Sequence, residues 1–154
     1  MDQASLLTIA RQRGADQQLP YAGAVTPIEA FQLLSADASV KLIDVRTQAE
    51  RDWVGKVAIA EDQHLAISWN LYPGGKANPD FAEQLKQQIP DPSTTIVFLC
   101  RSGVRSRHAA QAASTLGYLN CFDILEGFEG DKDQAQHRKT LGGWCFHNLP
   151  WIGA

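Results

Sequence analysis

The sequence predicts an α/β domain with a central, mostly parallel sheet flanked by helices on both faces. Short apolar runs rich in β-branched residues, typical of strands covered on both faces, alternate with segments of helical periodicity. This alternation indicates a parallel sheet, because each helix supplies the crossover to the next strand. The chain has 154 residues and is 44% hydrophobic, which fits one compact domain with a substantial core.

Two capping boxes begin the first helices of this domain. Residues 26–29, TPIE, combine a threonine cap with a proline at the first helical position. Residues 47–50, TQAE, repeat the box before a short helix that stops near Gly55. Between the two helices, the apolar segment 40–45 is predicted to be a strand.

The middle of the chain predicts a further strand, a turn and a helix. Residues 64–69 fit a short strand, and residues 72–75, YPGG, fit a turn. Helical spacing of apolar residues then indicates a helix from Asn78 to Ile89, which ends before the prolines at 90 and 92. Its apolar stripe consists of Phe81, Leu85 and Ile89.

The segment 94–116 carries the clearest chemical signal. Residues 95–99, TIVFL, are typical of a buried strand, and Cys100 ends it. A helix follows from Arg105 and ends at Gly117, and residues 121–125 are the next predicted strand. The apolar face of the helix is predicted to consist of Ala109, Ala112, Ala113 and Leu116.

The loop after Cys100 favours a reactive sulfur. In parallel sheets the reactive groups gather at the carboxyl ends of the strands, which is where Cys100 lies. A helix N-terminus presents unpaired N–H groups and roughly half a positive charge, so it favours a thiolate over a thiol. The guanidinium groups of Arg101 and Arg105 act in the same direction. We therefore expect Cys100 to be a nucleophile.

Composition argues against several other classes of protein. The net charge of −3 gives no cationic field for nucleic acid or an anionic membrane surface. No apolar stretch approaches the ~18 residues that a membrane span needs, and residues 1–18 lack the apolar core of a secretory signal. A cytoplasmic location is therefore the default expectation.

The remaining cysteines and histidines give no sign of a second site. The three cysteines are widely spaced and match neither a disulfide framework nor a CxxC metal pair. Cys121 and Cys145 are expected to pack in apolar surroundings. Metal-ligand spacing is also missing for His64, His137 and His147.

Other polar groups have structural interpretations. Asp44 and Arg46 follow a hydrophobic strand and are expected to form an ion pair, and His108 is expected to be a partly exposed helical residue. The polar segment 127–143 predicts a surface loop or a short solvated helix. Residues 144–151 regain apolar character and are expected to dock back onto the domain.

Four motifs occur in order along the chain. They are LIDVR at 42–46 followed by Glu50 and Gly55, CRSGVRS at 100–106, GY at 117–118, and LEG at 125–127. Together they resemble the single-domain rhodanese-like sulfurtransferases. The resemblance implies a rhodanese-like fold for residues 22–154, preceded by an N-terminal helical extension at residues 1–21, in a single compact domain overall.

The resemblance also implies a reaction, which is sulfur transfer of the thiosulfate type through a persulfide on Cys100, without a metal or organic cofactor. The thiolate attacks the outer sulfur of the donor and sulfite leaves. The donor would be thiosulfate, polysulfide, glutathione persulfide or a protein, and the acceptor cyanide, a thiol or a sulfur-relay protein. An open pocket would accommodate each of these.

The site then consists of the catalytic Cys100 and the loop after it. Successive backbone N–H groups can form an anion-binding nest, and the planar fork of Arg105 suits sulfonate oxygens. Arg101 would assist from the rim, and Ser106 either caps the helix or donates a hydrogen bond to the sulfur. The predicted substrate-binding residues are Arg101, Ser102, Gly103, Val104, Arg105 and Ser106.

Two other classes of function stay open. Cysteine phosphatases and arsenate reductases cradle a tetrahedral anion in a loop one residue longer than the four residues between Cys100 and Arg105. The shorter loop suits a smaller sulfur centre, and Arg107 would point away from it on the helix. A binding or carrier module without turnover is the second alternative, because folds host unrelated functions.

Overall fold

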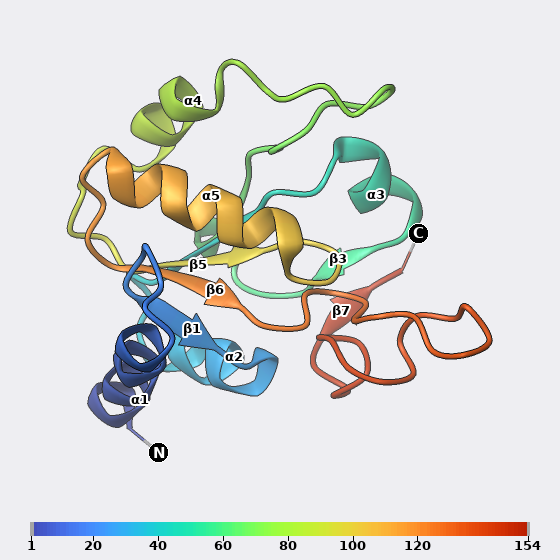
Figure 1. The fold of residues 1–154 in the computed structure, drawn as a ribbon, viewed down its shortest axis with the longest axis horizontal. Coiled ribbons are helices and arrows are strands. Elements are labelled where there is room, and N and C mark those ends of the chain that lie inside the picture. Colours follow the sequence, from blue (N-terminus) through green and yellow to red (C-terminus); the bar gives the residue numbers. More distant parts are fainter. Residues whose placement is uncertain (1, 154) are drawn as a thin grey trace.

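The computed structural model describes residues 2–153 and contains a five-stranded sheet (Figure 1). All neighbouring strands in it are parallel, so the predicted central sheet is confirmed. In spatial order the strands are β1 (Gly23–Val25), β6 (Cys121–Ile124), β5 (Ile96–Leu99), β2 (Lys41–Asp44) and β4 (His64–Ala66).

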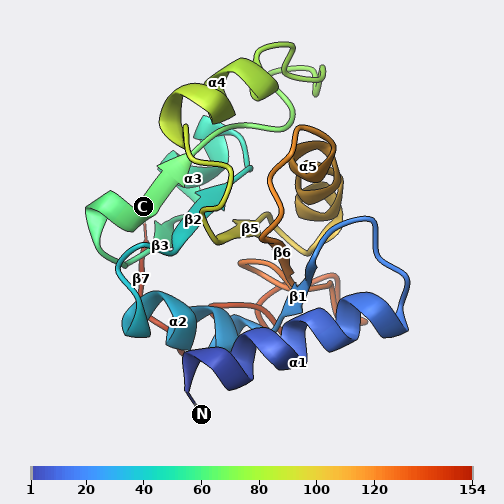
Figure 2. The same cartoon turned by 90° about the vertical axis from the view of Figure 1, so that its left-hand side faces the viewer.

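Helices cover both faces of this sheet, as predicted (Figures 1 and 2). One face carries α1 (Gln3–Asp16) and α2 (Pro27–Ala36). The other carries α3 (Gln48–Trp53), α4 (Phe81–Gln88) and α5 (Val104–Thr115). The remaining elements are a 3₁₀ helix, η1 (Glu61–Gln63), and an antiparallel pair formed by β3 (Lys56–Val57) and β7 (Trp151–Ile152).

Successive residues of β5 contribute to two apolar cores, one on each face of the sheet. Val97 and Leu99 join the core that contains residues of α1 and α2. Ile96 and Phe98 join the core that contains residues of α4 and α5. Because side chains alternate along a strand and β5 is covered on both faces, its sequence is apolar throughout.

The helix α1 packs on β1 at a close backbone approach. Leu6 and Ala10 are buried there, and a Cβ atom at Gly23 would come within 2.0 Å of the Ala10 carbonyl oxygen. Arg13 binds Glu29 of the predicted α2 capping box, with 2.9 Å between Nη2 and Oε2. These contacts fix α1 to both β1 and α2.

Two helices differ in detail from the prediction. The helix α4 begins at Phe81 rather than Asn78, because the Asn78 side chain accepts the Asp80 N–H and holds that segment in a turn. On α5, Leu116 is 37% exposed and Ala110 is fully buried in its place. Leu116 is the C-cap of this helix, next to the predicted end at Gly117.

The polar segment 127–143 contains turns and no helix, so the helical alternative is wrong. The chain then returns to the domain, as predicted. Trp144 is fully buried and its indole N–H donates to the Pro150 carbonyl oxygen at 2.7 Å, just before β7 pairs with β3. None of the helices within residues 2–153 has the length and apolarity needed to cross a membrane.

Candidate active site

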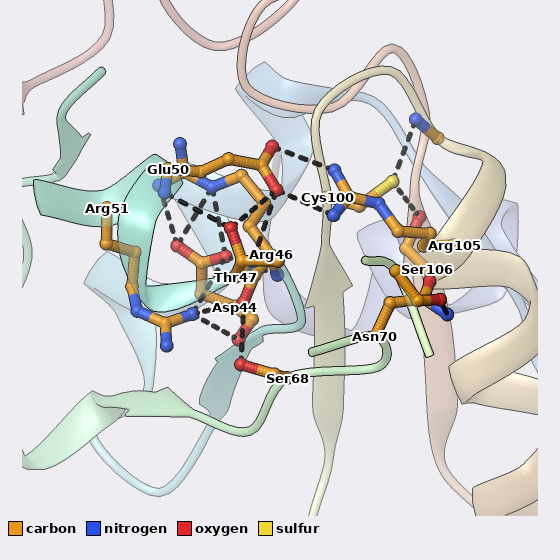
Figure 3. Close-up of polar contacts among 12 residues, drawn as sticks. Asp44, Arg46, Thr47, Glu50, Arg51, Ser68, Asn70, Cys100, Arg105 and Ser106 are labelled. Carbon is orange, nitrogen blue, oxygen red and sulfur yellow. Dashed lines mark hydrogen bonds and ion pairs between the residues drawn. The ribbon is translucent and has the colours of Figure 1, made fainter. Parts of the chain in front are cut away.

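Cys100 lies at the carboxyl end of β5, directly before the loop that opens α5 (Figure 3). Its Sγ atom accepts the Gly103 N–H at 3.1 Å and lies 3.2 Å from the Ser106 hydroxyl oxygen. Gly103 is the N-cap of α5 and has a φ of 107°, a left-handed conformation that suits glycine. The loop therefore curls back over the sulfur and directs a backbone N–H at it.

Ser106 does not cap the helix. Among residues 2–153 no side chain caps α5, so one of the two predicted roles of Ser106 is wrong. Its hydroxyl instead donates to Asp123 Oδ1 at 2.5 Å while it contacts the Cys100 sulfur. Because no side chain occupies the helix end, the N–H groups of the first turn are free to interact with an anion.

Arg105 is held by Glu50. Both terminal nitrogens of its guanidinium group donate to the Glu50 carboxylate, at 2.7 and 2.9 Å. Burial favours a higher pKa for Glu50, but the hydrogen bonds and charge of Arg105 outweigh it and lower this pKa to about 2. Glu50 also completes the predicted capping box with Thr47, so the pair joins α3 to α5.

We expect the Glu50–Arg105 pair to stabilise the fold down to strongly acidic pH. The pKa of Glu50 is lower in the folded chain than its ordinary value, so the stabilisation is present above that value and is lost as pH falls towards about 2. Denaturant unfolding at a series of pH values will measure it as the difference between the wild type and Glu50→Gln. A difference that vanishes already near neutral pH would contradict this expectation.

The sulfur is more enclosed than the sequence suggests. Cys100 is only 1% exposed, so within residues 2–153 its sulfur does not line the open pocket that we expected. In the view of Figure 3 the Arg105 guanidinium lies between the Cys100 sulfur and the Glu50 carboxylate. The rim of the loop, in contrast, is accessible, because Arg101 is exposed and Val104 is 51% exposed.

The turn after β6 is joined to the Cys100 loop by backbone hydrogen bonds. The Phe128 N–H donates to the Cys100 carbonyl oxygen at 2.8 Å, and the Glu129 N–H to that of Arg101 at 2.9 Å. A Cβ atom at Gly127 would come within 2.5 Å of the Arg101 carbonyl carbon. Gly127 of the LEG motif and the two residues after it thus contact the Cys100 loop through their backbone.

Asp44 and Arg46 form the predicted ion pair. Both are fully buried, with 2.8 Å between Arg46 Nη2 and Asp44 Oδ2. The same nitrogen donates to the Gly55 carbonyl oxygen at 2.8 Å, and the guanidinium carbon lies 4.4 Å from the centre of the Phe128 ring. Arg46 therefore connects β2, the end of the α3 segment and the turn after β6.

The other candidate nucleophiles and ligands lie outside the loop. Burial raises the pKa of Cys121 to about 12 and that of Cys145 to about 11, which keeps both as thiols. His108 is exposed and stacks on Trp69, with 6.5 Å between ring centres. Within residues 2–153 no three His, Cys, Asp or Glu side chains lie close enough together to hold a metal ion.

Comparison with known proteins identifies the family. The model of the rhodanese-like domain matches residues 27–134, which include the capping box at 47–50, the Cys100 loop and the LEG motif. This chain belongs to the rhodanese-like domain family. An uncharacterized protein of Rickettsia rickettsii is 36% identical over 125 residues, which cover 80% of this chain and 91% of the relative.

Solved structures agree with membership of the rhodanese-like family. The crystal structure of Rv0390 from M. tuberculosis has a TM-score of 0.79 and 36% identity, and the match covers 87% of this chain and 99% of that one. The polysulfide-sulfur transferase homodimer of Wolinella succinogenes matches with a TM-score of 0.59 and 19% identity, over 98% of this chain and 89% of that one. This second likeness concerns the rhodanese fold alone.

Proposed function

We propose that this rhodanese-like protein is a sulfurtransferase of the thiosulfate type. It moves sulfane sulfur from a small sulfur anion to cyanide, a thiol or a sulfur-relay protein, through a persulfide on Cys100. The observation that carries the proposal is the Cys100 sulfur at the end of β5, which accepts the Gly103 N–H at 3.1 Å beside the first turn of α5. That environment stabilises negative charge on sulfur, which both the thiolate and the persulfide carry.

The first half-reaction transfers one sulfur atom. The Cys100 thiolate attacks the outer sulfur of thiosulfate, a new S–S bond forms, and the bond between the outer sulfur and the sulfonate sulfur breaks. The electron pair of that bond leaves with sulfite, so the protein keeps Cys100–S–S⁻ and total charge is conserved. In the second half-reaction the acceptor attacks the terminal sulfur and the thiolate is regenerated.

The residues after Cys100 bind the donor in this proposal. The Gly103 N–H donates to the sulfur at the start of α5, and in the proposal Arg105 supplies the cation for the sulfonate oxygens. Arginine carries five N–H donors and Glu50 takes two of them, so others are available to a substrate. The full set is Arg101, Ser102, Gly103, Val104, Arg105 and Ser106, with exposed Arg101 at the rim.

Arg105→Lys will raise KM for thiosulfate about tenfold or more. A lysine cannot bind two oxygens at once with a planar group, and each hydrogen bond to a charged group contributes about 1.5–3 kcal/mol. Steady-state kinetics with cyanide as the acceptor will measure the change. Glu50→Gln is the matched control, since it disturbs the same pair but keeps the arginine. An equal rise of KM in both variants would mean that Arg105 acts only by holding Glu50.

The reaction class is tested by parallel assays of the wild type. Incubation with thiosulfate and cyanide should produce thiocyanate, and incubation with an aryl phosphate should release no phosphate. The opposite result would favour a phosphatase over the sulfurtransferase. A panel of donors and acceptors, compared by kcat/KM, will then identify the preferred pair.

Mass spectrometry separates sulfur transfer from binding without turnover. After exposure to thiosulfate, the protein should gain one sulfur atom, located on the peptide that contains Cys100. A dithiol reductant should remove this atom. If thiosulfate binds and no sulfur is gained, the protein is a binding module.

A further inference from the structure

The reaction proposed above leaves one buried acid of the site unused. Asp123 lies on β6 beside the Cys100 loop and is only 1% exposed. Its neighbours in the strand, Phe122 and Ile124, are apolar and fully buried. Within residues 2–153 its one hydrogen-bonded side chain is that of Ser106, and no salt bridge reaches it.

Three side chains form a continuous chain of hydrogen-bonding atoms. The Asp123 Oδ1 atom lies 2.5 Å from the Ser106 hydroxyl oxygen, which lies 3.2 Å from the Cys100 sulfur. A hydroxyl group has a single hydrogen, so Ser106 can donate either to the carboxyl group or to the sulfur, but not to both. The protonation of Asp123 therefore decides which neighbour receives that hydrogen.

Few charges act on Asp123 from the surrounding elements. Arg107 of α5 approaches it and favours its ionised form, and Tyr21 lies on the side of β1. Glu126 and Asp131 share with it the wall of a pocket of about 250 Å³ next to Gly103. Burial outweighs the Ser106 hydrogen bond and the Arg107 charge, and raises the pKa of Asp123 to about 7.

We propose that Asp123 is a positioning residue that holds the proton released by the Cys100 thiol, and that it thereby turns the Ser106 hydroxyl towards the sulfur. This inference rests on the proposed function of Cys100 as the sulfur carrier. The thiol proton moves to the Ser106 oxygen while the Ser106 proton moves to Asp123 Oδ1. No proton enters or leaves, and the negative charge moves from the carboxylate to the sulfur.

The arrangement gives the sulfur anion two hydrogen-bond donors, the Gly103 N–H and the Ser106 O–H. If Asp123 were ionised, it would accept the hydrogen bond of the Ser106 hydroxyl. The sulfur would then face a lone pair of the Ser106 oxygen. The sulfur anion and the Asp123 carboxylate therefore disfavour each other, so removal of the sulfur anion makes Asp123 easier to ionise.

The titration of Asp123 followed by NMR tests this coupling without any sulfur transfer. The side-chain carboxyl ¹³C resonance, assigned through the Asp123 backbone, will be followed against pH in the wild type and in Cys100→Ala. Removal of the sulfur anion should lower the midpoint of the Asp123 titration by about one pH unit or more. An unchanged or higher midpoint in Cys100→Ala would overturn the proposal.

The same Asp123 titration in Ser106→Ala variants is a second test, and it keeps the proposal testable if one variant folds poorly. Without the bridging hydroxyl, the additional change Cys100→Ala should shift the Asp123 midpoint less than it does when Ser106 is present. Ser106→Thr, which keeps a hydroxyl, should restore the full shift. Equal shifts with and without the hydroxyl would exclude Ser106 as the link.

A third measurement uses the reaction itself. The pH profile of kcat/KM for thiosulfate should contain a step near pH 7 in the wild type that is missing in Asp123→Asn, whereas the pocket control Asp131→Asn keeps it. A lower rate in Asp123→Asn with the same step would indicate a purely structural role and overturn the proposal. If the wild type transfers no sulfur, the proposed function fails, and the NMR titration still tests the proton link.

Discussion

Cys100→Ser will abolish sulfur uptake from thiosulfate and reduce the production of thiocyanate to the uncatalysed rate. A serine hydroxyl is not ionised near neutral pH and does not form a persulfide, although it is close in size to the thiol and keeps the contacts with Gly103 and Ser106. Mass spectrometry after thiosulfate exposure will measure the sulfur gained per chain. Circular dichroism and denaturant unfolding will check that the fold is retained.

Cys145→Ser is the matched control for this experiment. Cys145 is half-buried and lies outside the loop, and burial raises its pKa to about 11, so it carries little thiolate near neutral pH. We expect full sulfur uptake in Cys145→Ser. Persistent uptake in Cys100→Ser, or loss of uptake in Cys145→Ser, would show that a different residue carries the sulfur and would contradict the proposed site.

Arg46→Ala will lower the free energy of unfolding by about 3–5 kcal/mol, because it leaves the buried Asp44 carboxylate with only the more distant Arg51, 3.8 Å away. Asp44 is fully buried, and the alanine would also leave the Gly55 carbonyl oxygen without its donor and a space beside Phe128. Urea denaturation will measure the effect as a lower midpoint at an unchanged m-value.

The ion pair between Arg13 and Glu29 offers a comparison on the same chain. Its side chains are 28% and 16% exposed, so water screens the pair and Arg13→Ala should cost no more than about 1 kcal/mol. If both arginine variants lose about the same stability, then burial of the Asp44–Arg46 pair is not what makes it important.

Local patterns in the sequence predicted most of the fold. The capping boxes at Thr26 and Thr47 define helix starts within four residues, so no tertiary information is needed to find them. The apolar run of β5 likewise reflects its burial on both faces. Leu116 was misplaced because an apolar stripe indicates a helical face but not how far along the helix that face is covered by other elements.

The polar partners of the site depend on tertiary contacts that a linear pattern does not contain. Glu50 was found as a cap, and its contact with Arg105 spans 55 positions in the sequence. Asp123 was predicted only as part of a short strand, because a single acid in an apolar run does not show which side chain contacts it. Once the parallel order of β5 and β6 is known, the ends of these strands become neighbours and the contact with the loop can be inferred.

The absence of a side chain at Gly127 limits how this protein can be redesigned. Its backbone contacts that of Arg101 so closely that even a methyl group would push the two segments apart, and its φ of 67° adds a penalty for any other residue. An engineer who wants to admit bulkier donors therefore gains no room on that side. The accessible positions on the rim of the Cys100 loop, Arg101 and Val104, are where a mutant library should begin.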